Sequence, residues 1–343
     1  MTPGRRLQRF IQNTLIGTCV FLVVAPSVAG EYILTLPLGL QEQATYIPPD
    51  NPLTADKIQL GKQLYFDKRL SADGTVACAT CHAPDKGFSD GRSTSRGIKG
   101  QVGGRNAPVT INRLFSKEQF WDGRADSLED QALGPVQNPI EMGQTLEGMV
   151  ASLKKLKGYR EQFKKAFGTN VTKEGVAKAI ASFERTLLCG NSAFDKFEAG
   201  DKMALSQSAQ RGLTLFREKA KCVTCHTGFN FTDEGYHNIG VGMDKPNPDL
   251  GRYNVTKTEQ DKGAFKTPTL RNITTSAPYF HDGSTKTLEE VIEFYDRGGI
   301  INPHLSKEIR PLGLTAQGKA DVMAFLKSLS CPDLRVAAPA LPR

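Results

Sequence analysis

The chain has 343 residues and a formal net charge of +8, with 39% hydrophobic and 23% charged residues. Its basic residues are scattered and are not interleaved with aromatic side chains, which argues against nucleic-acid binding and fits a solvated surface with, at most, a patch for an acidic redox partner. After residue 29 no stretch is apolar enough to span a bilayer, so we expect no membrane span.

The first 29 residues have the layout of a secretory signal peptide. Arg5, Arg6 and Arg9 give a positive start, residues 14–25 form an apolar run, and the small residues that end at Ala29 suit signal peptidase. The apolar run is shorter than the roughly 20 residues of a membrane anchor. We therefore expect cleavage near Ala29, export to the periplasm, and a mature chain of about 310 residues, long enough for two domains.

Helical patterns dominate the rest of the sequence. Five segments begin at a Ser or Thr suited to a helix N-cap and then place apolar residues at three-to-four spacing. They are residues 54–66, 172–188, 206–219, 287–297 and 315–329. Long stretches rich in Gly, Pro and Asn lie between them, and loops of such length need an organising group such as a large rigid cofactor. The sequence therefore predicts a mainly α fold with long ordered loops.

A short internal repeat indicates two similar domains. The sequence G-K-Q-L-Y at residues 61–65 and the sequence G-L-T-L-F at residues 212–216 each precede a cysteine-rich motif. A polar segment around Gly200 is the expected join. We thus expect a signal peptide at 1–29, a first domain at 30–200, a second domain at 201–335 and a flexible tail at 336–343.

Two C-x-x-C-H motifs carry the main chemical argument. They are Cys78-Ala79-Thr80-Cys81-His82 and Cys222-Val223-Thr224-Cys225-His226. In such a motif both thiols form thioethers with a haem, and the His binds the iron. A thioredoxin-like dithiol does not need this His and requires strands that the chain barely shows, while a zinc site would leave both histidines as coincidence. We predict two covalently bound haem c groups, one in each of two cytochrome c-like helical domains.

Two other cysteines of the mature chain, Cys189 and Cys331, belong to neither motif. Export permits a disulfide between them, but two buried free thiols fit the sequence equally well. Their separation along the chain says nothing of their distance in space, so both readings stay open.

The sixth ligand of each iron decides what a haem protein does. An electron-transfer haem is closed by a second protein ligand, whereas a haem that reacts with hydrogen peroxide needs an open position. Outside the two motifs the chain has only His237, His281 and His304, and none of them lies in the first domain. The residues alone leave a peroxide-reacting enzyme and a non-enzymatic di-haem electron carrier as alternatives.

The sequence resembles the bacterial di-haem cytochrome c peroxidases and, within that family, the MauG-like subgroup. The resemblance runs from about residue 60 to residue 329. Four motifs carry it: F-W-D-G-R-A at 120–125, N-P-I-E-M at 138–142, T-P-T-L-R-N at 267–272 and A-P-Y-F-H-D-G at 277–283.

For the first haem, the resemblance implies a peroxidatic centre on His82. Glu141 matches the family's distal carboxylate, with Gln131 and Pro135 in the same pocket, and cleavage of peroxide needs a base that takes and returns a proton. By composition alone, Glu141 would be an exposed loop carboxylate. Trp121 matches a tryptophan that relays electrons between the haems, although a lone Trp is more often a core aromatic.

For the second haem, on His226, the resemblance implies an electron-storing centre. Ordinary members of the family have a Met ligand fourteen residues after the His of the P-Y-F-H motif, and that position here is Tyr295, as in the MauG-like subgroup. An anionic phenolate would stabilise higher oxidation states of the iron. The alternative is that Tyr295 belongs to the apolar face of the helix at 287–297.

Two further sites follow from the resemblance. The loop at residues 83–105 contains no His that could close the first haem, so this haem should be open without prior reduction. Asn106, with the backbone carbonyls of Ser276 and Pro278, matches a calcium site between the domains, and oxygen ligands suit that cation. Asn106 could instead be an ordinary turn residue.

The resemblance implies a peroxidase that reduces hydrogen peroxide with electrons from a small redox protein, a cytochrome c or a cupredoxin. An alternative is a MauG-like oxidase that uses a high-valent di-haem state to modify side chains of a partner protein. Tyr295 favours this alternative. Ala220 weakens it, because MauG has a tryptophan two residues before its second haem motif.

Overall fold

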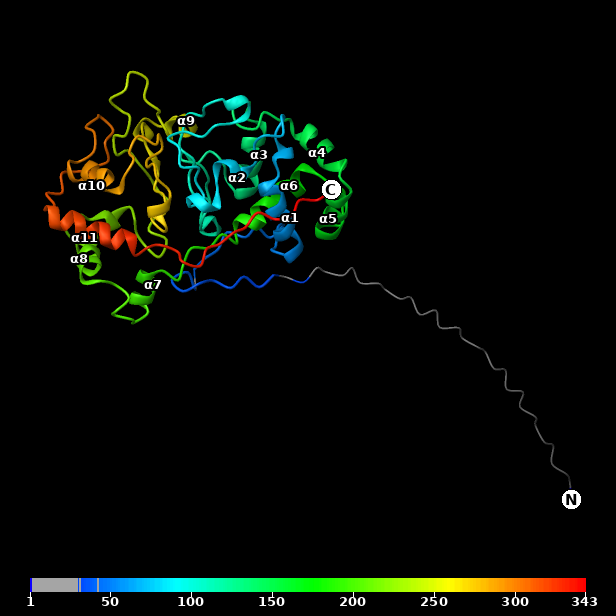
Figure 1. The fold of residues 1–343 in the computed structure, drawn as a ribbon, viewed down its shortest axis with the longest axis horizontal. Coiled ribbons are helices and arrows are strands. Elements are labelled where there is room, and N and C mark those ends of the chain that lie inside the picture. The colour runs from blue at the N-terminus through cyan, green and yellow to red at the C-terminus, as the bar shows by residue number, and fades with distance from the viewer. Residues whose placement is uncertain (2–29, 31, 42) are drawn as a thin grey trace.

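The computed structural model describes residues 1, 30, 32–41 and 43–343 (Figure 1). Residues 2–29, which hold the expected signal peptide and its cleavage position, lie outside the described residues. The described chain is mainly helical, so the predicted fold class is confirmed. Within this part of the chain, no helix combines the length and the apolar character needed to cross a membrane.

The structure is a set of short helices joined by long loops (Figure 1). The helices are α1 (Ala55–Phe66), α2 (Cys78–Cys81), α3 (Leu128–Gln137), α4 (Leu146–Lys154), α5 (Lys157–Phe167), α6 (Lys173–Glu184), α7 (Ala193–Glu198), α8 (Gln207–Arg217), α9 (Tyr253–Thr256), α10 (Leu288–Asp296) and α11 (Ala316–Lys327). One small antiparallel sheet pairs β1 (Tyr236–His237) with β2 (Phe265–Lys266).

Each of the five helices expected from the sequence begins at its predicted N-cap. Thr54, Thr172, Ser206, Thr287 and Thr315 each accept a hydrogen bond from a backbone N–H of the first turn. Helix α1 ends at Phe66 as predicted, and the other four helices end earlier than expected. Helix α6 stops at Glu184 rather than at residue 188, because the next residues turn the chain with tighter i→i−3 bonds.

Two separate hydrophobic clusters lie in the two ends of the molecule. The first half, α1 to α6, buries one cluster, and the second half, α8 to α11, buries another. Helix α1 packs on α6, and α8 packs on α11. A side chain at Gly61 would overlap the Ala179 carbonyl, and one at Gly212 would overlap the Asp321 carbonyl. The glycine of the sequence repeat therefore permits close helix contact in both halves.

The chain passes between the halves through α7. Phe194 of α7 packs in the cluster of the second half, and Asp195 forms a buried ion pair with Arg271, at 2.8 Å. This helix precedes Gly200, so contacts with the second half begin before the expected join. The domain boundaries themselves stay a prediction.

A disulfide joins Cys189 to Cys331, with the two Cα atoms 5.3 Å apart. The question left open by the sequence is thus answered in favour of the disulfide. From Cys331 the chain runs back along the first half (Figure 1). Arg69 donates to the Pro342 carbonyl at 3.0 Å, and Gln63 donates to the Ala340 carbonyl at 3.0 Å. Residues 336–343, expected as a flexible tail, lie against the first half in this structure.

Candidate functional site

The two C-x-x-C-H motifs open onto one continuous cavity of about 620 Å³. Cys81 and His82 line it on the side of the first half, and Cys222, Cys225 and His226 line it on the side of the second half. This volume lies in the range of large-ligand sites, and its walls are mostly apolar. The structure therefore brings both predicted attachment motifs to a shared space.

Both motif histidines are held in the same way. Nδ1 of His82 lies 3.3 Å from the carbonyl oxygen of Phe88, and Nδ1 of His226 lies 3.0 Å from that of Phe231. Burial lowers the pKa of both rings, which favours the neutral form that binds a metal. With Nδ1 tied to the backbone, Nε2 of each ring is the atom left for iron.

All four motif cysteines are free thiols, and Cys81, Cys222 and Cys225 line the cavity wall. Burial raises the pKa of Cys81 to about 11 and that of Cys222 to about 12. A neutral sulfur is therefore favoured there, and a thioether is neutral. Four free motif thiols, two histidines with free Nε2 atoms and a large apolar cavity fit two haem c groups.

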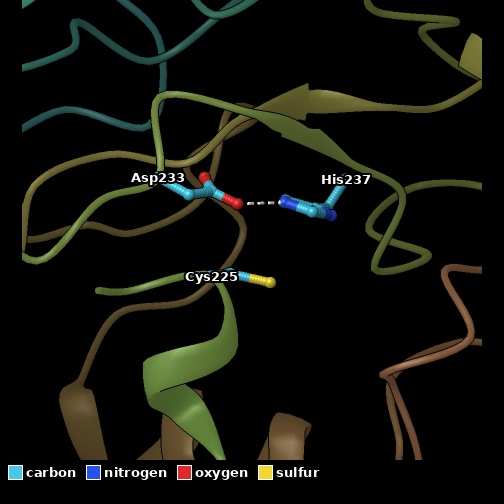
Figure 2. A group of neighbouring side chains, drawn as sticks. All are labelled: Cys225, Asp233 and His237. Atoms are coloured by element: carbon cyan, nitrogen blue, oxygen red, sulfur yellow. Dashed lines mark hydrogen bonds and ion pairs between the residues drawn. The ribbon is translucent and has the colours of Figure 1, made fainter. Parts of the chain in front are cut away.

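A cluster that the sequence did not reveal lies at the edge of the second motif (Figure 2). The ligand atoms of Cys225, Asp233 and His237 lie within 4.8 Å of one another, and His237 Nε2 is 2.7 Å from an Asp233 carboxylate oxygen. This geometry resembles a metal site, but the C-x-x-C-H motif predicts that Cys225 is used in a thioether. Asp233 and His237 then form an ion pair, since the hydrogen bond to Asp233 raises the pKa of His237. The i, i+4 spacing of Asp233 and His237 was the available signal.

Glu141 lines the cavity on the His82 side, together with Gln131 and Pro135 of α3. Its Oε1 accepts a hydrogen bond from Asn138 Nδ2 at 2.7 Å. Burial raises the pKa of the Glu141 carboxyl above its usual range. The alternative of an exposed loop carboxylate does not fit this position, because the side chain faces the cavity.

Trp121 lies where the two halves meet. Its indole Nε1 donates to the Asn106 carbonyl at 2.9 Å, and its own carbonyl accepts from the backbone N–H of Lys266 at 2.8 Å. The ring lines the cavity shared by both motifs. This is a suitable place for an aromatic side chain that connects two redox groups.

Tyr295 lies on α10 and lines the cavity on the His226 side. Burial raises the pKa of its phenol well above the usual range. Among the described residues its hydroxyl has no hydrogen-bond partner, although buried hydroxyls normally find one. An unpartnered phenol that faces the cavity fits a ligand better than a plain core aromatic.

The residues matched to calcium also line this cavity. Asn106, Ser276 and Pro278 are all part of its wall, and Asn106 and Ser276 are buried. Asn106 Nδ2 donates to the Arg92 carbonyl at 2.8 Å. The side-chain oxygen of Asn106 therefore points away from Arg92. The structure thus brings the three residues to one region from both halves.

The structural repeat extends much further than the glycine motifs. Asn112 and Asn272 both have left-handed backbone, with φ of 55° and 58°, as do Phe120 and Phe280, with φ of 68° and 69°. The segment at residues 112–120 leads into the N-capped helix α3, and the segment at residues 272–280 leads into the N-capped helix α10.

Pro135 stands at the same distance from the cap of α3 as Tyr295 from the cap of α10. The first half therefore has a proline, which offers no side-chain ligand, at the position where the second half has a phenol. At this position only the second half therefore offers a side-chain oxygen to the cavity.

Comparison with known proteins agrees with this geometry. A family model described as di-haem cytochrome c peroxidase matches residues 55–203. The methylamine utilization protein MauG of Methylophilus methylotrophus is 40% identical over 300 residues, which cover 86% of this chain and 88% of that protein. The cytochrome c551 peroxidase of Nitrosomonas europaea is 41% identical over 296 residues, covering 85% of each chain.

A solved structure is similar over the same length. The crystal structure of a MauG-like protein associated with microbial copper homeostasis is 34% identical, with a TM-score of 0.77. The match covers 86% of this chain and 96% of that one. The similarity therefore extends through both halves and the cavity between them.

Proposed function

The chain belongs to the di-haem cytochrome c peroxidase family, and from this premise we propose that it reduces hydrogen peroxide to water in the periplasm. It is an oxidoreductase of a family with two haems. The electrons come from a small redox protein, a cytochrome c or a cupredoxin. Two electrons and two protons convert one peroxide molecule into two waters.

The two motifs would hold the haems. Cys78 and Cys81 attach the first, with His82 as its iron ligand, and Cys222 and Cys225 attach the second, with His226. The support is the pair of histidines whose Nδ1 atoms are tied to backbone carbonyls at the wall of one cavity. Tyr295 would bind the second iron, and its unpartnered hydroxyl at the same wall supports this role.

The carboxyl of Glu141 is the observation that carries the proposed activity. When bound, the first haem supplies an iron that binds peroxide and takes up its oxidising equivalents. Glu141 removes the proton from one peroxide oxygen and returns it to the other, which leaves as water. Asn138 holds the Glu141 carboxyl at 2.7 Å, and Gln131 is placed to orient the peroxide.

Trp121 carries electrons between the halves in this proposal. Its backbone contact with Lys266 and its place in the shared cavity support this role. A calcium ion held by Asn106, Ser276 and Pro278 would stabilise the junction around it, because the Asn106 carbonyl is the acceptor of the indole N–H.

Replacing Glu141 with Gln tests the activity. The amide cannot accept the peroxide proton, so we expect the reaction of the oxidised protein with stoichiometric peroxide, followed by the Soret band, to slow by about 10²- to 10⁴-fold. The exposed Glu147 on α4 gives a matched control. Glu147→Gln should react as the wild type does.

Equal rates in Glu141→Gln and Glu147→Gln would remove Glu141 from the mechanism. A wild-type protein whose Soret band does not change with peroxide would instead support the non-enzymatic electron carrier. Absence of the reaction in wild type would therefore contradict the whole proposal, and not only one residue.

A second candidate function is oxidation of side chains on a partner protein. The 40% identity to MauG and the position of Tyr295 favour it, whereas the buried Ala220 before the second motif removes the aromatic side chain that MauG has there. Incubation of the peroxide-treated protein with a reduced cytochrome c or cupredoxin distinguishes the two. Rapid oxidation of the small donor supports the peroxidase, and failure to oxidise it favours the second function.

A further inference from the structure

Two ionisable side chains in the cavity wall lack the partners that buried charged groups need. Arg113 belongs to the 3-10 turn Arg113–Phe115, and Glu184 ends α6. Neither takes part in the chemistry proposed above. Both come from the first half, and both are of types that are rarely buried unless paired.

Arg113 is held in place by neutral groups only. Its Nε donates to Gln119 Oε1 at 2.7 Å, and one Nη donates to the Glu118 carbonyl at 2.9 Å. Gln119 is itself fixed, because its amide donates to the Ser116 carbonyl at 3.0 Å. No carboxylate of the described residues lies within 4.0 Å of the guanidinium, and burial lowers its pKa. Arg113 is half-buried, and a cation that keeps free N–H groups at a cavity wall is a suitable site for an anion.

Glu184 is only 3% exposed, and no group among the described residues forms a hydrogen bond with its carboxyl. The neighbouring Arg185 is not an ion-pair partner of Glu184, because it forms an ion pair with Glu129 at 2.7 Å. Burial raises the pKa of Glu184 to about 8. At neutral pH the group is therefore mostly a neutral acid, with an O–H to donate and no acceptor for it.

The two groups face the same part of the cavity. The charges of Glu234 and Glu184 both act on Arg113, and Arg113 in turn acts on Glu184, although neither carboxylate is close enough to Arg113 for an ion pair. Glu184 also acts on Cys78 and Tyr65, and the Tyr65 hydroxyl donates to the His82 carbonyl at 2.8 Å. The gap between Arg113 and Glu184 therefore lies on the side of the first motif.

The repeat shows that the pair is specific to this half. When the two halves are aligned on Asn112 and Asn272, Arg113 corresponds to Ile273. Gly61 contacts Ala179 and Gly212 contacts Asp321, so these two residues are equivalent in the repeat. Five residues further along the chain, Glu184 corresponds to Leu326. Ile273 and Leu326 also line the cavity, so the second half replaces both polar residues with apolar ones at once.

We infer that Arg113 and Glu184 form a carboxylate subsite that holds one propionate of the haem attached at Cys78 and Cys81. The guanidinium supplies the charge, and the neutral acid donates a second hydrogen bond. The inference rests on the proposed haem attachment but not on any reaction with peroxide. A cation beside this haem also favours its reduced state, since reduction adds a negative charge.

The test compares four variants of the holoprotein by haem content and by the midpoint potential of each haem. Arg113→Gln removes the charge and Arg113→Lys keeps it, while Glu184→Ala removes the donor and Glu184→Gln keeps one. In Arg113→Gln we expect reduction of the first haem to become roughly tenfold less favourable, about 59 mV for one electron. Arg113→Lys and Glu184→Gln should lie close to wild type. The second haem should not change in any of them.

Resonance Raman spectra add a direct reading, because the propionate bending band reports hydrogen bonding to that group. The band of one propionate should shift in Arg113→Gln and in Glu184→Ala. Unchanged potentials and bands in both of these variants, with two haems per chain, would overturn the inference, and so would a shift confined to the second haem. Fewer than two haems in wild type would instead contradict the haem attachment.

Discussion

At the scale of single residues, the site is defined by acidic side chains at the cavity wall, and two of them, Tyr295 and Glu184, form no hydrogen bond with the described residues. Tyr295, Glu141 and Glu184 all face the cavity, and burial raises the pKa of each. Desolvation of this kind disfavours the charged form of an acid, and for Glu141 it also makes the carboxylate a stronger base. The three residues therefore mark where the haems and peroxide would interact with the protein.

Tyr295→Phe should open the second iron, because the ring stays and the oxygen is lost. We expect an optical and EPR spectrum in which the second haem changes ligation while peroxide still reacts at the first. Tyr279 gives a matched control, since it is buried in the same half but donates to the Ile273 carbonyl at 3.1 Å. A Tyr295→Phe spectrum identical to that of Tyr279→Phe would exclude Tyr295 as a ligand.

Glu184 should make stability depend on pH. Its pKa is about 8 in the fold and 4.5 in the reference state, so the folded protein binds the extra proton between these values. The resulting stability is complete below about pH 4.5 and is lost as the pH rises through about 8. Thermal unfolding from pH 5 to 9 should show a steeper loss in wild type than in Glu184→Gln. Parallel curves for the two proteins would contradict this assignment.

At the scale of elements, the repeat of loop and helix explains why two similar halves can serve different roles. Both halves use a left-handed Asn, a positive-φ Phe and an N-capped helix to bring one helix position to the cavity. That position is Pro135 in α3 and Tyr295 in α10. In the proposed arrangement, this single difference in side chain separates an open site from a closed one.

Pro135→Tyr should close the first iron with a phenolate, as we propose that Tyr295 closes the second. The expected result is loss of the open-site spectrum and a peroxide reaction slowed by at least about 10²-fold, because peroxide needs a free position. Pro135→Ala should keep the site open and serves as the control. Retention of the open-site spectrum in Pro135→Tyr would show that the helix positions are not equivalent.

Much of the helical framework could be predicted from the sequence, and the missed elements have physical reasons. Five N-caps were located correctly because a Ser or Thr precedes an apolar pattern of helical period. Helix α3 was not predicted, since Gly134 and Pro135 lie inside it and both residues normally break helices. Here the proline is retained in a short helix at the cavity wall.

The site was predictable where covalent chemistry fixes the spacing. The C-x-x-C-H motifs need their residues adjacent in sequence, so Cys78, Cys81 and His82 could be identified directly. Arg113 and Glu184 could not, because their significance depends on the absence of partners after folding. Whether a charged residue is paired is a property of the tertiary structure and leaves no local pattern.

At the scale of the whole molecule, the disulfide closes a loop that contains nearly all of the second half. Cys189 and Cys331 are separated by 142 residues, and Cys331 lies where the chain returns to the first half. A cross-link over so long a loop removes much conformational freedom from the unfolded chain. The link therefore stabilises the assembly of both halves more than either half alone.

Replacing both Cys189 and Cys331 with Ala should lower the free energy of unfolding by about 2–4 kcal/mol. Urea unfolding followed by circular dichroism measures the change. Wild type treated with a thiol reductant should behave like the double variant, which controls for the change in side-chain volume. Identical unfolding midpoints for wild type and variant would mean that the cross-link contributes nothing.

The return of residues 332–343 to the first half has a consequence for how the protein can be divided. Leu334 and Val336 cover a cluster that contains Tyr65, and Arg69 binds the Pro342 carbonyl. A fragment that stops before the second half would leave that surface bare. The two halves are therefore not independent of each other. A recombinant fusion of the first half to another protein must also contain residues 332–343, because these residues cover the surface beside the first C-x-x-C-H motif.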